Sequence, residues 1–526
     1  MDLIAMLGVA FAFFLAHWLV GCVWNVYFHP LSKFPGPRAA ASSLLWRFLH
    51  EVVYQSDITH ALPKLHRKYG KIIRTGPNEI HLSDPAAYHE IYTGKVRWNK
   101  DEFLYHSLGE NGSAFGSLSV EEAKPRKSTL APPFSRRAVS SYNDLLKLHA
   151  NRLCNVLKQN DKRHEACDLL YAFRSFSLDV ISKIAFCESL NAIDHPGFKH
   201  PILVSFDDAL PAFQAAKFFP WIYGQLHSFS PSTIDRLWHS TGSLLRFRDY
   251  LVDIVLDLQS NRKNEDKEPC LLHKLMDPSK HTAEPKLSAD TLQGEAQTVI
   301  SGGVESVAHT AVYAAVFVGQ DRTIANRLRV ELEQIWPDPV GNIPDLAQLE
   351  KLPFLTAVLK ESLRLAPGIP TPLPRVVPRN GATIGGKFIP GGTVVGASAQ
   401  MLHYSEDLFK DAHLFKPDRW LHQEAQELDY WLVPFSKGPR ACVGLNLAWA
   451  KLYMELAAIF RRFDIELTLQ SSLYGFDPLS LPGCNDADGS STINRKTGDF
   501  VWRDCFLPYL TSTHPSAYFH AVEGYD

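Results

Sequence analysis

The N-terminal apolar run constrains this chain most, because residues 3–28 contain no Asp, Glu, Lys or Arg. A helix of that length can cross a hydrocarbon core about 30 Å thick. A cleaved signal peptide and a buried core helix are the alternatives. No basic residue precedes the run, it exceeds the usual signal core of roughly 7 to 15 residues, and it ends in bulky aromatic residues, which argues against a signal peptide. We therefore predict a single-pass transmembrane anchor over residues 1–28.

A proline-rich stretch at residues 29–38 follows the predicted anchor. Proline removes a backbone donor and biases the preceding residue toward extended geometry, so this stretch cannot continue the helix. We expect a stiff hinge that orients the rest of the chain on the membrane. Lys33, Arg38 and Arg47 lie just after the anchor, and the positive-inside bias then places residues 39–526 in the cytosol.

The composition favours one large globular domain over residues 39–526. The full sequence of 526 residues is 45% hydrophobic, and no Gly/Ser-rich or charge-rich linker divides its middle. The net charge of −2 gives no basic field for nucleic acid, so we expect no nucleic-acid partner. The eight cysteines are scattered without a C-x-x-C pair, which predicts neither a disulfide framework nor a zinc site and suits a reducing compartment.

Helical periodicity dominates the predicted domain. Apolar residues recur three and four positions apart over residues 58–69, 142–158 and 244–258. The segments 71–82 and 382–399 are instead typical of β-hairpins with Gly and Pro turns, and we expect them to form a small edge sheet. The charged stretch 261–268 is expected to be a solvated loop. The fold is therefore predicted to be mainly α with small β sheets.

A glycine-bracketed loop at residues 435–444 delivers Cys442 to the start of an apolar-periodic helix. The free N–H groups and the dipole at a helix N-terminus favour a thiolate over a thiol. Gly438 and Gly444 carry no Cβ, so the backbone there can approach a flat ligand closely. Arg440 is two residues before the sulfur and can bind a carboxylate. We interpret the other seven cysteines as small buried hydrophobic residues.

The whole loop fits the pattern F-x-x-G-x-R-x-C-x-G and resembles the haem-binding signature of the cytochrome P-450 family. The resemblance implies that Cys442 is the axial ligand of a haem b iron, with Phe435, Gly438, Arg440 and Gly444 around the cofactor. It also implies the cytochrome P-450 fold, in which the haem lies between a long central helix and the helix that follows the cysteine loop.

Two further motifs recur in the family's order. Residues 361–364, E-S-L-R, resemble the family's E-x-x-R, and residues 415–420, F-K-P-D-R-W, resemble its F-x-P-x-R-W element. An E-x-x-R alone is a weak signal, because an exposed pair on any helix can show it. The order and spacing strengthen it here. By resemblance, Glu361, Arg364 and Arg419 form a buried ion network.

A long helix is predicted from an N-cap at Ser288 to about residue 319. Its centre, G-G-V-E-S at residues 302–306, resembles the family's oxygen-activation motif A/G-G-x-D/E-T. Paired glycines in a helix cost roughly 1 kcal/mol each relative to alanine, so they need a reason: close approach to a porphyrin, or a tight helix crossing. The resemblance implies that Glu305 and Ser306 relay protons to dioxygen. Ser306 departs from the usual threonine, since it keeps the hydroxyl but loses the methyl that fixes its rotamer.

Two more arginines are candidate haem ligands by resemblance. Residues 122–127, E-A-K-P-R-K, occupy the place of the family's W/H-x-x-x-R, and Arg126 would bind a haem propionate. Glu122 does not match the aromatic or histidine residue of that pattern. Arg375 resembles another propionate contact; a surface arginine is the alternative.

The resemblance implies a monooxygenase that hydroxylates, epoxidises or further oxidises a lipophilic small molecule with O2. The chain has no flavin domain and no dinucleotide-binding motif, so electrons would come from a separate membrane-bound NADPH-cytochrome reductase. We expect substrate contacts from residues 98–118, 202–223 and 367–373 and from the helix around Val304, where aromatic residues give an apolar pocket. The location implied is the endoplasmic reticulum membrane.

The substrate class rests on analogy alone. The wording of the hinge, H-P-L-S-K-F-P-G-P at residues 29–37, resembles fungal microsomal members that tailor terpenoid, polyketide or alkaloid skeletons. Two alternatives remain open. One is a haem-thiolate isomerase or dehydratase that needs no reductase, which the Ser306 departure allows. The other is a non-catalytic haem protein that senses or carries a ligand.

Overall fold

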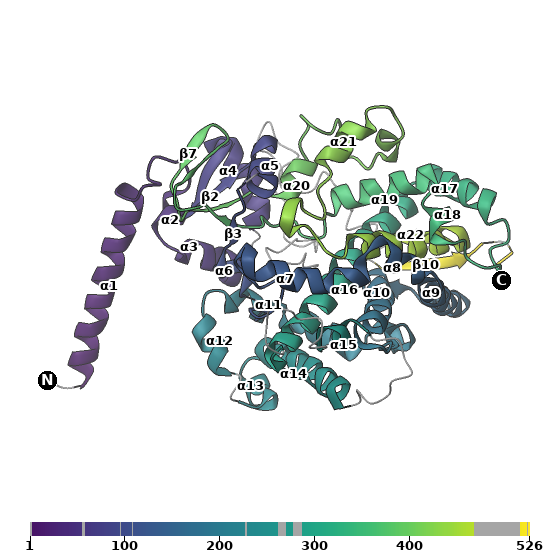
Figure 1. The fold of residues 1–526 in the computed structure, drawn as a ribbon, viewed down its shortest axis with the longest axis horizontal. Coiled ribbons are helices and arrows are strands. Elements are labelled where there is room, and N and C mark those ends of the chain that lie inside the picture. Colours follow the sequence, from purple (N-terminus) through teal and green to yellow (C-terminus); the bar gives the residue numbers. More distant parts are fainter. Residues whose placement is uncertain are drawn as a thin grey trace.

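The structure is a computed structural model that describes residues 3–54, 58–94, 96–107, 109–226, 229–260, 270–276, 287–467, 516–522 and 524–525. The predicted loop at 261–268 lies outside the described residues, as do Cys484 and Cys505. Helices make up most of the described fold, and small sheets lie beside them (Figure 1). The predicted fold class, mainly α with small β sheets, is confirmed.

The bounds of the elements follow the chain. The helices are α1 (Leu3–Tyr27), α2 (Arg38–Ser42), α3 (Leu45–Phe48), α4 (Ile58–Tyr69), α5 (Pro85–Thr93), α6 (Glu102–Tyr105), α7 (Val120–Leu130), α8 (Arg136–Ser141), α9 (Asn143–Arg163), α10 (Leu169–Phe186), α11 (Pro201–Ala216), α12 (Pro220–Leu226), α13 (Pro231–Leu237), α14 (His239–Ser260), α15 (Leu271–Met276), α16 (Ala289–Gln320), α17 (Arg322–Ile335), α18 (Leu346–Leu349), α19 (Pro353–Leu365), α20 (Ala399–His403), α21 (Ala425–Trp431) and α22 (Leu445–Arg462). The strands are β1 (Ile72–Gly76), β2 (Glu79–Leu82), β3 (Asn99–Lys100), β4 (Cys167–Asp168), β5 (Arg375–Val376), β6 (Ala382–Ile384), β7 (Lys387–Ile389), β8 (Val394–Gly396), β9 (Phe463–Leu467) and β10 (Ser516–Ala521).

The central helix α16 organises the core. It packs against α10, α14, α19 and α22, and the side chain of Ser288 caps it by accepting a hydrogen bond from the Thr291 N–H, as predicted. Both α1 and α16 are long and apolar enough to cross a membrane, but 72% of the α16 window is buried inside the protein and none of the α1 window is. We therefore assign α16 to the core and keep α1 as the candidate membrane span.

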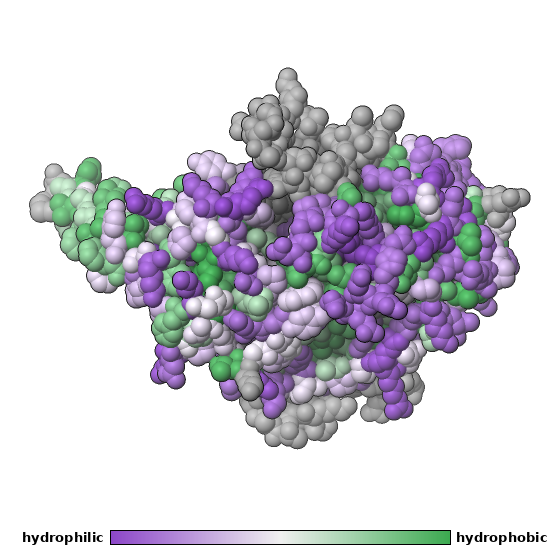
Figure 2. Space-filling view, turned by 90° about the horizontal axis from the view of Figure 1, so that it is seen from above, coloured by the Kyte–Doolittle hydropathy of each residue, from purple (hydrophilic) through white to green (hydrophobic). Residues whose placement is uncertain are grey.

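The N-terminal helix α1 projects from the body as a single rod (Figure 1), and its surface is largely apolar (Figure 2). The hinge that follows is attached to the first sheet. Leu31 is fully buried, and Gly36 lies so close to the Arg74 carbonyl that a Cβ there would overlap it. The buried Arg74 guanidinium donates to the Asn25 carbonyl at 2.8 Å, near the end of α1. These contacts hold the hinge against β1.

The predicted edge sheet is more divided than we expected. Hairpin β1–β2 forms as predicted and belongs to a five-stranded sheet of order β1-β2-β8-β5-β3. The segment 382–399 splits, because β6 and β7 pair only with each other while β8 runs parallel to β2. Gly392, with φ of 81°, lies between β7 and β8. Strands β4, β10 and β9 form a third sheet.

Candidate functional site

A cavity of about 280 Å³ lies between α16, the cysteine loop and the start of α22. Cys442 lines it together with Gly302 and Ser306 of α16, so the two motifs that the sequence predicts to meet do meet. Its lining also includes Tyr105, Glu110, Phe115, Lys127, Thr298, Gly303, Thr371, Arg375, Phe435, Arg440, Gly444 and Lys451.

The cysteine loop is held by its own backbone and by α5. The Cys442 N–H donates to the Phe435 carbonyl at 2.9 Å. Gly438 has a φ of 75°, and a Cβ on it would overlap the Tyr92 carbonyl at the end of α5. Gly438 is therefore required by packing against α5, a reason other than the ligand approach that we expected. A Cβ on Gly444 would lie 3.8 Å from the Cys442 sulfur, which is an ordinary contact.

The ionisation of Cys442 differs from the expectation. Its side chain is accessible because it faces the cavity, yet protein surrounds the sulfur on its other sides. Burial raises the pKa of the Cys442 thiol, although the Gly444 N–H, the Lys127 charge and the Leu445 N–H act in the opposite direction. The helix N-terminus alone thus does not outweigh desolvation. A cation at the sulfur, such as a haem iron, would favour the thiolate.

Lys127 of α7 supports the cysteine loop, and the sequence reasoning missed it. Its ammonium donates to the Pro439 carbonyl at 2.9 Å and to the Ala441 carbonyl at 2.8 Å. These two acceptors flank Arg440, and Ala441 immediately precedes Cys442. The motif comparison drew attention to Arg126, one position earlier, because only that position belongs to the family pattern.

The three arginines predicted to bind the haem propionates differ in their position relative to the cavity and in their hydrogen bonds. Arg440 donates to the carbonyl oxygens of residues 117–119, and its Nε is buried without a hydrogen-bond partner among the described residues. Arg126 does not line the cavity, but its Nε and Nη1 are likewise buried and unpartnered within the described part of the chain. Arg375 is buried rather than on the surface and donates to the Tyr105 hydroxyl at 2.7 Å. Glu122 is exposed.

The two glycines at the centre of α16, Gly302 and Gly303, lack a side chain for different structural reasons. A Cβ on Gly302 would meet nothing within 4 Å, so this position opens onto the cavity. A Cβ on Gly303 would lie 2.9 Å from the Ile181 side chain, because α10 crosses α16 there. Close approach to a ligand therefore explains Gly302, and helix crossing explains Gly303. Lys451 of α22 donates to the Gly303 carbonyl at 2.8 Å.

The two residues of the predicted proton-relay pair, Glu305 and Ser306, face different sides of α16. Ser306 lines the cavity, and its hydroxyl donates to the Gly302 carbonyl at 3.0 Å. Glu305 is buried and does not line the cavity; its carboxylate lies 2.5 Å from the Arg174 guanidinium of α10. One residue of the pair thus faces the cavity and its neighbour faces a helix interface.

The structure brings Glu361, Arg364 and Arg419 together in the core. Arg364 donates to both carboxylate oxygens of Glu361, at 2.8 and 3.0 Å, and Arg419 donates at 3.0 Å. Burial by itself raises the pKa of Glu361, but the two arginines and the Lys416 N–H hold it below its ordinary value. The Trp420 indole also donates to this carboxylate, at 2.9 Å. The F-x-P-x-R-W element includes this tryptophan, but the predicted ion network contained only its charged residues.

His403 connects this network to the cysteine loop and was also missed. Its Nε2 accepts from the Val433 N–H at 2.9 Å, two residues before Phe435. Its Nδ1 lies 3.0 Å from the Arg364 carbonyl, so Nδ1 carries the proton. Burial lowers the pKa of His403 to about 3, which keeps the ring neutral. Nothing in the sequence pattern marks this histidine.

A buried carboxylic acid lines the cavity on the α16 side. Glu110 accepts a hydrogen bond from the Thr298 hydroxyl at 2.7 Å, and burial raises its pKa to about 8. Glu295 lies nearby and accepts from the Ala114 N–H at 2.7 Å; burial raises its pKa to about 7. The sequence predicted this loop as a substrate contact but only through its aromatic residues, of which Phe115 lines the cavity.

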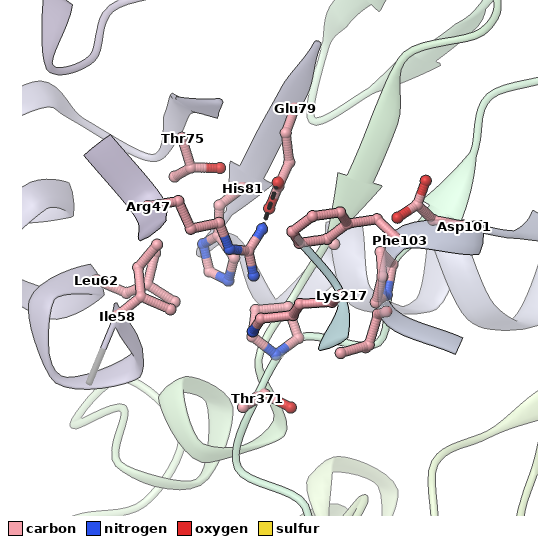
Figure 3. A pocket seen from close by; sticks show the side chains of 14 residues that line it. Arg47, Ile58, Leu62, Thr75, Glu79, His81, Asp101, Phe103, Lys217 and Thr371 are labelled. Carbon is pink, nitrogen blue, oxygen red and sulfur yellow. Dashed lines mark hydrogen bonds and ion pairs between the residues drawn. The ribbon is translucent and has the colours of Figure 1, made fainter. Parts of the chain in front are cut away.

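Segments 98–118 and 367–373 and α16 on both sides of Val304 line the cavity, in keeping with the predicted substrate contacts. None of the described residues of 202–223 lines it, so the contacts expected from that segment stay a prediction. Phe206 and Phe213 of α11 are buried in the core, where the Phe206 ring contacts the Phe247 ring of α14. Lys217 lines a separate cavity of about 30 Å³, with Arg47 and Glu79 paired at 2.7 Å (Figure 3). Thr371 lines both cavities, as the predicted 367–373 contact requires.

The residues present fit a haem. The accessible sulfur, the open face at Gly302 and the buried unpartnered nitrogens of Arg126 and Arg440 supply an axial ligand, room for a flat group and donors for carboxylates. These features come from three separate segments of the chain, namely α7, α16 and the cysteine loop, and all but Arg126 line one cavity.

Comparison with known proteins agrees with this geometry. A model of the cytochrome P-450 family matches residues 40–477. The chain is 31% identical to the cytochrome P-450 monooxygenase flvC of Aspergillus flavus, over 96% of this chain and 94% of that protein. It is 32% identical to the conidiogenone synthase of Penicillium rubens, over 85% of this chain and 89% of that protein. A crystal structure of a cytochrome P-450 shares the fold with a TM-score of 0.70 at 19% identity, covering 93% of this chain and 99% of that chain. The chain is therefore a member of the cytochrome P-450 family of haem-thiolate monooxygenases.

Proposed function

We propose that this protein hydroxylates, epoxidises or further oxidises a lipophilic small molecule in fungal secondary metabolism. It uses O2 and electrons that a separate membrane-bound NADPH-cytochrome reductase delivers. The observation that carries the proposal is the shared cavity, in which the sulfur of Cys442 and the Gly302–Ser306 turn of α16 face the same space. The similarity to fungal monooxygenases, among them a conidiogenone synthase, supports the pathway class.

Haem b, when bound, would supply an iron able to activate dioxygen, and a thiolate ligand would increase the electron density on that iron. Cys442 provides that thiolate. Arg126, Arg375 and Arg440 hold the propionates, which is supported by the buried, unpartnered nitrogens of Arg126 and Arg440. Phe435, Gly438 and Gly444 give the loop the shape that presents the sulfur.

Proton delivery is proposed to pass through Ser306, with Glu305 as the buried acid behind it. The Ser306 hydroxyl faces the cavity, where it could hold and pass on a proton. The Glu305 carboxylate is tied to Arg174, so it reaches the cavity only if this ion pair rearranges. Glu361, Arg364 and Arg419 act at a distance by fixing the core around the cysteine loop.

The substrate is proposed to be lipophilic with one polar group. Most of the cavity wall is apolar, and Glu110 places a carboxyl group in it. Because burial keeps this acid protonated at neutral pH, it can donate a hydrogen bond to a carbonyl or hydroxyl without the cost of burying a charge. Glu110 therefore orients one end of the substrate.

Residues 1–28 are proposed to span the endoplasmic reticulum membrane once, with residues 29–38 as the hinge and residues 39–526 as the cytosolic catalytic domain. The exposed apolar surface of α1 and the attachment of the hinge to β1 support this division.

A reductase-independent isomerase or dehydratase is the second candidate. One observation favours it: the Ser306 hydroxyl already donates to the Gly302 carbonyl, so its proton is engaged within α16. Such an enzyme would rearrange an oxygenated substrate without consuming NADPH.

Reconstitution of the full chain with reductase, NADPH and candidate lipophilic substrates tests both. Substrate-dependent NADPH oxidation with an oxygenated product is expected. Turnover in the absence of reductase and NADPH would contradict the monooxygenase proposal and support the isomerase. Ligand binding without any turnover would indicate a carrier or sensor.

A further inference from the structure

Three metal-ligating side chains meet where α10 ends beside α15. The sulfur of Cys187 lies 3.5 Å from Nδ1 of His273, and the sulfur of Cys270 lies 3.5 Å from the same nitrogen. All three ligand atoms lie within 4.8 Å of one another. None of these residues lines the Cys442 cavity in the described structure, so the cluster has no part in the proposed oxygen chemistry.

We propose that Cys187, Cys270 and His273 bind one zinc ion, with a water molecule as the fourth ligand. Zinc prefers a tetrahedral arrangement with Zn–S near 2.3 Å and Zn–N near 2.0–2.1 Å, which places a sulfur and a nitrogen ligand about 3.6 Å apart. Both observed sulfur–nitrogen separations are 3.5 Å. The side chains are therefore already spaced for the ion.

Hydrogen bonding explains the arrangement less well than a metal does. A neutral imidazole nitrogen without a proton has one lone pair and can accept from one thiol only, and a thiol is a weak donor. Two sulfurs nevertheless lie at the same distance from Nδ1. Two thiolates would neutralise the charge of a divalent cation, and a set of two sulfurs and one imidazole selects zinc over magnesium or calcium.

The backbone at Cys187 supports a functional reason for the cluster. Cys187 follows the last residue of α10 with a φ of 64°, a left-handed conformation that favours glycine. A non-glycine residue held there stores strain that a functional contact can justify. On the other side, Cys270 immediately precedes α15, and its spacing of three residues to His273 places both on one side of the first turn.

The site would attach a short helix to the core. The helix α15 has six residues, and it contacts α7, α10, α14 and α16. Cys187 and His273 are partly exposed, which leaves access for the ion and for a water ligand. Our prediction of no zinc site relied on the absence of paired cysteine spacing. It did not consider a C-x-x-H turn completed by a cysteine that is remote in sequence.

Metal analysis of the full-length protein, purified without a histidine tag and dialysed against a weak chelator, tests the proposal. We expect one zinc ion per chain. X-ray absorption at the zinc edge, which haem iron does not obscure, should show two sulfur ligands near 2.3 Å and nitrogen or oxygen ligands near 2.0 Å. Cys187→Ser and Cys270→Ser should each lower zinc affinity by about a hundredfold or more, because thiolates supply much of the binding free energy.

The matched control is Cys167→Ser, which changes a buried cysteine of β4 outside the cluster and should retain zinc. Alkylation of the unmutated protein gives a second measurement that does not depend on a variant folding: zinc should protect Cys187 and Cys270 together. Equal zinc content in all variants, nitrogen and oxygen ligands alone, or absence of protection would mean an adventitious ion only and would overturn the proposal. A Cys187–Cys270 disulfide in the freshly purified protein would also overturn it.

Discussion

The guanidinium of Arg174 lies 2.5 Å from the carboxylate of Glu305 and joins α10 to the centre of α16. The same guanidinium lies 2.7 Å from Asp207 of α11. Arg174 and Glu305 are both buried, so each charge depends on its partner to replace the water that it lost on folding. The three helices α10, α11 and α16 are thereby held together through one arginine.

Replacing Arg174 with methionine should lower the free energy of unfolding by about 3–5 kcal/mol, because Glu305 would remain a buried charge without its cation. Arg174→Lys should lose less, since it keeps the charge. Urea unfolding followed by circular dichroism measures the change. The control is Arg152→Met, which breaks a partly exposed pair with Asp194 and should cost about 0–1 kcal/mol. Equal losses in both methionine variants would contradict the buried-pair interpretation.

Replacing Cys442 with alanine should abolish the thiolate-type shift in the spectrum of the reduced carbon monoxide complex, because the axial sulfur produces it. Cys154→Ala, at a fully buried cysteine of α9, should leave the shift in place. A thiolate-type shift that persists in the Cys442→Ala variant would refute the assignment of Cys442 as the iron ligand.

Ser306→Ala should lower product formation by about a hundredfold while NADPH oxidation continues, because a positioned hydroxyl aids proton transfer. Ser306→Thr keeps the hydroxyl and should keep product formation. The ratio of product to NADPH, measured in the reconstituted system, separates the two. An unchanged ratio in Ser306→Ala would show that Ser306 does not relay protons.

Glu361 should make stability fall in acid. Its pKa is lowered in the folded protein relative to the ordinary value of 4.5, so its contribution is present above that value and is lost as pH falls below it. Glu361→Gln should remove this part of the acid sensitivity and should destabilise the protein at neutral pH by about 3–5 kcal/mol, because two arginines lose their carboxylate. Unfolding curves from pH 3 to 7 measure both effects. A wild-type acid slope in the variant would contradict this prediction.

Glu110 should change the stability with pH in the opposite direction to Glu361. Its pKa is raised from 4.5 to about 8, so between these values the folded state binds more protons than the unfolded state and stability falls as pH rises. Glu110→Gln, which mimics the protonated acid, should flatten this slope. Glu295→Gln is the control, because its acid contributes in the same direction only up to about pH 7. Identical slopes in wild type and Glu110→Gln would exclude a protonated Glu110.

Local patterns were sufficient for much of the fold. The predicted helix at 58–69 matches α4, the one at 142–158 overlaps α9 from residue 143 onward, and the one at 244–258 lies within α14, because helical periodicity is a property of neighbouring residues. Pairing beyond a hairpin was not predictable in the same way. Strand β8 pairs with β2 and not with its sequence neighbour β7, and the sequence of β8 does not indicate that it pairs with β2.

The functional site also combines features that are visible in the local sequence with features that depend on the fold. The residues of the cysteine loop were found because they lie within ten positions, whereas Lys127, His403 and Glu110 reach the site from distant segments without a motif. Desolvation was also invisible in the sequence. The helix terminus at Cys442 was expected to favour the thiolate, but burial, which depends on the whole fold, dominates its pKa.

The sequence by itself determined the apolar N-terminal helix, the family, most of the helix spans and the loop that presents Cys442, since each depends on residues a few positions apart. Only the tertiary structure decided that Ser306 faces the cavity while Glu305 pairs with Arg174. It also decided that Gly438 packs closely against the end of α5. The cluster of Cys187, Cys270 and His273 likewise forms only in the folded chain. The physical reason is that the direction of a side chain and its loss of water depend on which helices pack around it, and packing joins segments that are remote in the chain.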